Sequence, residues 1–119
     1  MKIRIKGNSL RYRLSMSDIA QFERDGYVEE VVDFGRSQLT YSLQTGPTQS
    51  LVAEYANNKI IVFMPHAWSD ELVNTGRVGF GNNSSGLYLL IEKDFQCLDN
   101  VAEDQSDNYP NPLAAQSLS

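Results

Sequence analysis

The strongest constraint on the fold is the alternation of apolar and basic side chains in the first fourteen residues, MKIRIKGNSLRYRL. Successive side chains of a β-strand point to opposite faces, so a period of two predicts strands at 2–6 and 9–14. Gly7 and Asn8 favour a tight turn between these strands. One face of the predicted hairpin is apolar. The other, which we call the basic face, is formed by Lys2, Arg4, Lys6, Arg11 and Arg13.

The basic face contrasts with the rest of the chain. The 119 residues include 10 basic and 15 acidic side chains, which gives a net charge of −5. Because residues 1–14 hold five of the basic side chains and none of the acidic ones, the remainder is strongly acidic. Phosphate contacts supply most nucleic-acid affinity, so general nucleic-acid binding is not expected. Contact between the basic face and a single anion remains compatible with the charge distribution.

Length and composition indicate one globular domain with its own core. No apolar run reaches the roughly 18 residues of a membrane-spanning helix, and no secretory signal is expected at the N-terminus. Cys97 is the single cysteine, which excludes an internal disulfide. These features are typical of a cytoplasmic protein.

The pattern continues as a helix over 15–26, strands over 27–34 and 37–43, and then a second series. This series comprises strands over 51–56 and 59–64, a helix over 65–76, and strands over 77–80 and 87–94 around the loop GNNSSG. Ser15 or Ser17 is expected to cap the first helix, and Gly26 and Gly76 are expected to end the two helices.

A shift of fifty residues aligns Asn8 with Asn58 and Gly26 with Gly76. We therefore predict an α+β, mostly β, barrel-like domain of two pseudo-repeated strand-strand-helix-strand-strand halves, 1–46 and 49–94. The alternative is a chance match between alternating patterns. An irregular tail, 95–112, completes the domain over 1–112, and 113–119 are expected to be disordered.

Two interpretations of the basic face remain open. It is either a solvated face paired with carboxylates of its own chain, or a cradle for a small anion or an acidic protein partner. We expect internal pairing, with segment 99–107 as the first source of carboxylates and Glu29 and Glu30 as further candidates. Glu30 lies in phase with Val28, so it is either a paired carboxylate on the buried face or, as we favour, turned outward by a bulge.

One hypothesis is a metal site in the tail. The densest cluster of potential metal ligands in the sequence is formed by Cys97, Asp99, Glu103, Asp104 and Asp107. One thiolate among carboxylates is not a recognised zinc spacing, so a buried cysteine beside a solvated acidic loop is the alternative. The sequence has no nucleophile elbow, phosphate-binding glycine loop or HExxH motif. His66 is interpreted as a surface residue.

Two stretches, MKIRIKGNSLRYRL and LIEKDFQCLDNVAEDQSDNYPNP, resemble an uncharacterised family of short bacterial proteins found in Bacteroidetes-type bacteria. This resemblance implies a self-contained cytosolic protein and transfers no functional residues. The stretch NKIIVFMPHAWSDELVNTGRVGFGNNSSGLYLLIEKD resembles the half-unit of cradle-loop barrels, such as the swapped-hairpin transition-state regulators, which bind DNA through basic residues.

Three functions are consistent with these features. The first is a non-enzymatic binding or accessory module that uses the basic face. The second is a metal-binding protein or enzyme with a site around Cys97 and the acidic tail. The third is a DNA-binding regulator of the cradle-loop type. The sequence identifies no cofactor and no oligomeric state.

Overall fold

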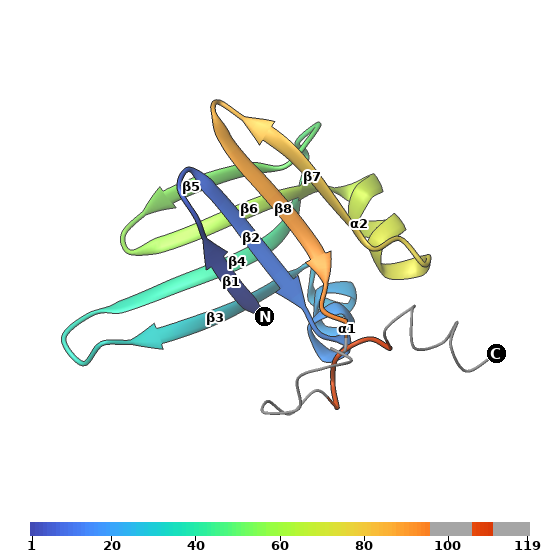
Figure 1. Cartoon of the computed structure of the whole chain (residues 1–119), viewed down its shortest axis with the longest axis horizontal. Coiled ribbons are helices and arrows are strands. Elements are labelled where there is room, and N and C mark those ends of the chain that lie inside the picture. The colour runs from blue at the N-terminus through green and yellow to red at the C-terminus, as the bar shows by residue number, and fades with distance from the viewer. Residues whose placement is uncertain (96–105, 111–119) are drawn as a thin grey trace.

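The structure, a computed structural model, describes residues 1–95 and 106–110 and forms two four-stranded sheets with two helices (Figure 1). The first sheet contains, in spatial order, β1 (Lys2–Ile5), β2 (Ser9–Leu14), β8 (Leu87–Lys93) and β7 (Gly79–Ser84). The second contains, in spatial order, β3 (Tyr27–Asp33), β4 (Gln38–Gly46), β6 (Lys59–Pro65) and β5 (Val52–Ala56). The predicted mostly β, α+β domain is confirmed.

Both sheets are built by the same kind of pairing. β1–β2, β3–β4, β5–β6 and β7–β8 are antiparallel hairpins. The central contact of each sheet is parallel and joins distant parts of the chain, β2 with β8 and β4 with β6. In the β1–β2 ladder Ile5 faces Leu10, and fifty residues later Tyr55 faces Ile60. Superposition of the two halves stays a prediction.

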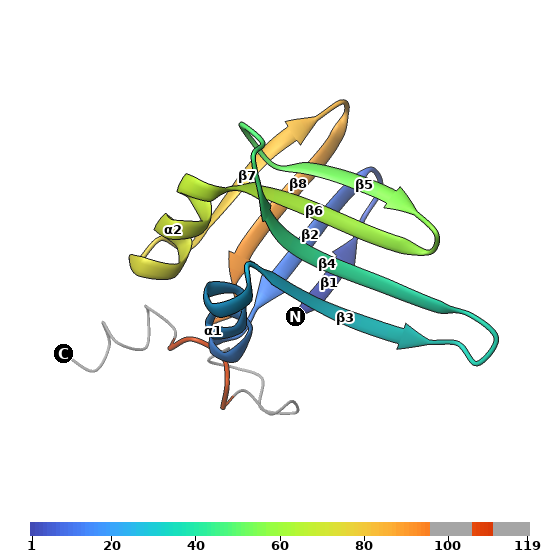
Figure 2. The same cartoon turned by 180° about the vertical axis from the view of Figure 1, so that it is seen from behind.

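The helices α1 (Met16–Asp25) and α2 (His66–Asn74) lie at one end of the two sheets, away from the turns of β3–β4 and β5–β6 (Figures 1 and 2). Ser15 caps α1 and shares a capping box with Asp18. Gly26 ends α1 with a φ of 65°, a left-handed conformation that glycine adopts without strain. The equivalent expectation for Gly76 is wrong, because α2 ends at Asn74 with Thr75 in an extended conformation at the cap.

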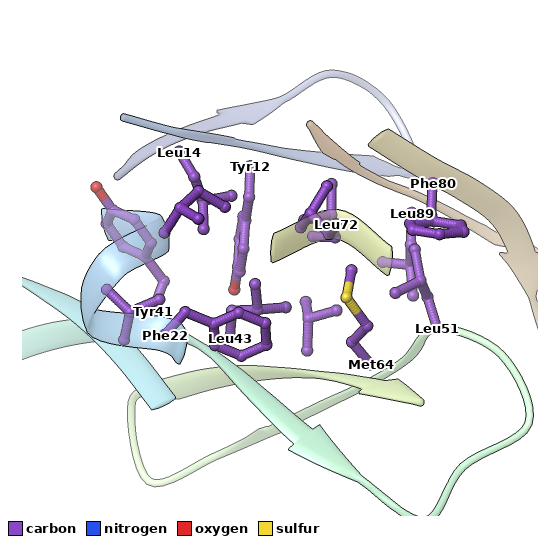
Figure 3. Packing of buried hydrophobic residues seen from close by; sticks show 14 of the residues in the cluster. Tyr12, Leu14, Phe22, Tyr41, Leu43, Leu51, Met64, Leu72, Phe80 and Leu89 are labelled. Atoms are coloured by element: carbon purple, nitrogen blue, oxygen red, sulfur yellow. The ribbon is translucent and has the colours of Figure 1, made fainter. Parts of the chain in front are cut away.

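The core lies between the sheets and is completed by the helices. Tyr12 and Leu14 extend from the first sheet toward Leu43 and Met64 of the second (Figure 3). All four side chains are fully buried. The apolar side of the β1–β2 hairpin therefore anchors it to the core and leaves its basic side facing outward.

Turn chemistry explains most hairpin ends. Asn57 and Asn58 both have positive φ, 53° and 60°, as a two-residue turn of this kind requires. The predicted loop at 81–86 is wrong in length, because Gly81–Ser84 continue β7 and only Ser85 and Gly86 form the turn. β7 lies at the edge of its sheet, and most of its side chains are polar or absent. A strand of this composition lacks the apolar alternation from which strands are predicted.

The amino group of Met1 ties β1 to the second sheet. It is buried and donates to Glu30 Oε1 at 2.9 Å, and it lies 2.8 Å from Asp18 Oδ2. The Met1 carbonyl accepts a hydrogen bond from the Tyr41 hydroxyl. The β3 register is unbroken, so the predicted bulge at Glu30 is wrong and its carboxylate is paired.

Opposing effects act on the Met1 amine. Burial lowers its pKa, but the hydrogen bonds and charges of Asp18 and Glu30 outweigh burial and raise the pKa above its ordinary value of 8.0. Because the folded-state pKa is raised, the stabilisation is fully present below pH 8 and is lost as pH rises through the folded-state pKa.

We predict that Glu30→Gln lowers the free energy of unfolding at pH 7 by on the order of 1 kcal/mol, because a partly exposed charged hydrogen bond is weakened. The loss should shrink above the raised pKa of the amine. Urea unfolding between pH 7 and pH 10 measures both effects. Glu54→Gln, at an exposed position of β5, is the control, and equal behaviour of the two variants would contradict the role of Glu30.

Candidate functional site

The basic face forms on the outer side of the first sheet because of the β1–β2 register. Lys2 lies directly opposite Arg13, and Arg4 lies directly opposite Arg11. Side chains opposite one another on antiparallel strands are about 4.5–5.5 Å apart at Cβ, and like charges at such positions are destabilising. The hairpin is therefore held together by its apolar side and by charges from elsewhere.

Strand β8 supplies these charges. The parallel register places Glu92 beside Arg13, and the Glu92 Oε1 atom accepts from the Nε atoms of Arg11 at 2.5 Å and Arg13 at 3.1 Å. Asp94, just after β8, lies 3.0 Å from Lys2 Nζ. Within residues 1–95 and 106–110, the basic face is thus paired with Glu92 and Asp94, two carboxylates outside the predicted sources. Residues 99–105 of the predicted tail source lie outside the described residues, so that part of the expectation stays a prediction.

The turn end of the basic face is different. Among the residues that the structure describes, neither Arg4 nor Lys6 has a carboxylate within 4.0 Å. Arg4, Lys6, Ser9 and Arg11 line a shallow pocket of about 240 Å³. A second pocket, of about 160 Å³, lies toward Lys2 and Arg13. Arg4 and Arg11 line both pockets. Arg4, which has no carboxylate within 4.0 Å among the described residues, therefore borders both of these spaces.

The described part of the tail lies elsewhere. The Asp107 carboxylate accepts hydrogen bonds from the backbone N–H and the hydroxyl of Ser17 at the start of α1, and hydrogen bonding to Ser17 lowers the pKa of Asp107. The Asp107 carbonyl accepts from the Met16 N–H. Pairing of Asp107 with the basic face is therefore wrong.

The other predicted metal candidates cannot be placed with Asp107. Cys97, Asp99, Glu103 and Asp104 lie outside the described residues. Within 1–95 and 106–110, no three His, Cys, Asp or Glu side chains are grouped so that they could hold a metal ion. In that same part of the chain, no helix is both long and apolar enough to cross a membrane.

A third pocket lies between the two helices, and the sequence pattern did not predict it. Its volume is about 250 Å³, and Thr45 at the end of β4 contributes a hydroxyl to it. This hydroxyl lies 3.0 Å from His66 Nδ1 and accepts from Ser69 at 3.2 Å. His66 and Ser69 thus each link α2 to β4 through one hydrogen bond with Thr45. Asp70 and Glu23 give this pocket acidic walls, so it does not suit the anion that the basic face would take.

Glu92 and Asp94 can be predicted as partners of the basic face only when the strand order of the sheet is known. In LYLLIEKD, Glu92 is one outward position among several, and nothing local connects it to Arg11, eighty-one residues away. Only the parallel β2–β8 pairing brings the two together.

Comparison with known proteins identifies the family but no activity. A family of unknown function, DUF7009, matches residues 1–113. No curated protein and no solved structure matches the chain significantly. Because the match covers nearly the whole chain, the protein belongs to the DUF7009 family of unknown function.

Proposed function

We propose that this domain is a non-enzymatic binding module whose basic face takes an anionic group, either a small anion or an acidic segment of a protein partner. One observation carries the proposal. Arg4 lies directly opposite Arg11, yet no carboxylate among the described residues lies within 4.0 Å of Arg4.

The charge balance along the hairpin supports this location. At the Lys2 end, Glu92 and Asp94 face the cations. At the turn end, Arg11 shares the single Glu92 carboxylate with Arg13, while Arg4 and Lys6 add two further positive charges. An arriving anion would relieve repulsion there without displacing an existing partner. Guanidinium groups suit such a role because they bind carboxylate and phosphate groups through paired hydrogen bonds.

The alternatives have less support. A DNA-binding role would need a larger positive surface than one hairpin on a chain of net charge −5. A metal centre or enzyme site in the tail would have to be built without Asp107, which is engaged by Ser17. The single cysteine is in keeping with the cytoplasmic location that we also propose.

We predict that Arg4→Glu weakens the binding of a fluorescein-labelled octa-aspartate peptide by at least tenfold, since it replaces attraction by repulsion at the pocket. Fluorescence anisotropy at low ionic strength measures the affinity, and added salt should weaken wild-type binding. Arg36→Glu, which makes the same charge change in the exposed β3–β4 turn, should weaken it far less. An equal loss of peptide affinity in both variants would mean that binding depends only on the net charge of the protein, and would contradict the proposal.

We also predict that Glu92→Gln strengthens octa-aspartate binding several-fold, because it releases Arg11 and Arg13 from their internal carboxylate. The same titration measures the change. Glu71→Gln is the matched control, because Glu71 pairs with Arg77 on the distant α2 side of the molecule. Unchanged or weaker binding by Glu92→Gln would show that Arg11 and Arg13 take no part.

A further inference from the structure

The opposite side of the β1–β2 hairpin forms an apolar groove with strand β5. The groove has a volume of about 260 Å³. In both views of the molecule, β5 passes close to the turn end of β1–β2 (Figures 1 and 2). The apolar side chains that line it are Ile5, Leu10, Ala53, Tyr55, Ile60 and Leu87.

The groove exposes side chains that occupy inward positions of the two sheets. Leu10 and Ile60 pack against the core, and Ile5 and Tyr55 are their direct partners across the two ladders. Ile5 is nevertheless 60% exposed and Tyr55 67% exposed. The apolar interior between the sheets therefore continues into an opening between the two hairpins, which neither α1 nor α2 lines.

The groove and the basic pocket meet at the turn of the β1–β2 hairpin. Ser9 lines both of them, with Gly7 and Asn8 on the groove side and Lys6 on the basic side. Alternation along β1 places Ile5 on one side of the sheet and Arg4 on the other. A ligand that occupies both sites must therefore pass around the end of the hairpin.

The position of the groove and the basic pocket on opposite sides of one hairpin limits the kinds of partner that can occupy both. A flat surface, such as a membrane, or a rigid rod, such as duplex DNA, cannot contact two opposite faces of one hairpin together. A small free anion would leave the groove open. A volume of 260 Å³ is also below the roughly 300–1,000 Å³ typical of sites for drug-sized molecules and cofactors, and it suits one or two apolar side chains.

We infer that the partner of the basic face is a flexible protein segment in which acidic residues lie within a few positions of an apolar or aromatic residue. The apolar side chain occupies the groove between Ile5 and Tyr55, and the acidic residues reach around the turn to Arg4 and Lys6. Glu54 contributes a negative charge to the β5 wall of the groove, so the acidic part of the segment lies toward β1–β2. This inference rests on the proposed function and names its partner.

The test uses the full chain and two labelled synthetic peptides. Both contain four aspartates and a Gly-Ser spacer, followed in one by Leu-Phe and in the other by Ser-Ser. Anisotropy should show that wild-type protein binds the Leu-Phe peptide about tenfold more tightly than the Ser-Ser peptide. Tyr55→Ser should abolish this difference while leaving the affinity for the Ser-Ser peptide unchanged. Phe34→Ser is the matched control, because Phe34 is 68% exposed on β3–β4 but does not line the groove.

The outcomes separate the two claims. Equal affinity of wild-type protein for both peptides, with binding still sensitive to Arg4→Glu, would overturn the inference and leave the proposed function intact. Binding of both peptides that is insensitive to Arg4→Glu would overturn both. Sedimentation with vesicles of phosphatidylcholine and phosphatidylserine, if lost on Tyr55→Ser, would assign the groove to a lipid surface and overturn the inference. Circular dichroism of each variant checks that the exposed substitutions leave the fold unchanged.

Discussion

The parallel pairing of β2 with β8 is the contact on which the basic hairpin depends. It joins residues 9–14 to residues 88–93, and it gives Tyr12 and Leu14 a place in the core beside Leu89 and Ile91. The same register places the Glu92 carboxylate within hydrogen-bond distance of Arg11 and Arg13. One set of backbone hydrogen bonds therefore fixes the apolar anchor of the hairpin and the charge balance of its outer face.

The uneven charge balance is more informative than the number of basic residues. Exposed ion pairs add only about 0–1 kcal/mol each, so pairing with β8 does not by itself explain why five cations share one hairpin. Within the described part of the chain, carboxylates offset this repulsion near Lys2, whereas none lies within 4.0 Å of Arg4 or Lys6. The proposed binding role would account for this arrangement, because cations without a carboxylate partner among the described residues retain their attraction for an anionic ligand.

Local patterns predicted most of the elements but not their partners. The hairpin turn at Asn57–Asn58, the cap at Ser15 and the left-handed Gly26 follow from residue preferences within a few positions. The polar pattern GNNSSG predicts a loop at Asn82, whereas Asn82 lies in β7 and its side chain forms two hydrogen bonds with the Leu51 backbone. Alternation along the chain indicates the basic face. Its carboxylate partners, the groove and the interhelical pocket instead arise from contacts between elements that are far apart in the sequence.

The central claim is that the cations nearest the turn bind an external anion while those nearest Lys2 remain internally paired. Two-dimensional NMR of the arginine Nε–Hε groups during titration with octa-aspartate tests it most directly. The account predicts that the Arg4 signal shifts most, that Arg11 follows, and that Arg36 stays unchanged. A uniform small shift of all arginines, or a larger shift at Arg36 than at Arg4, would contradict it.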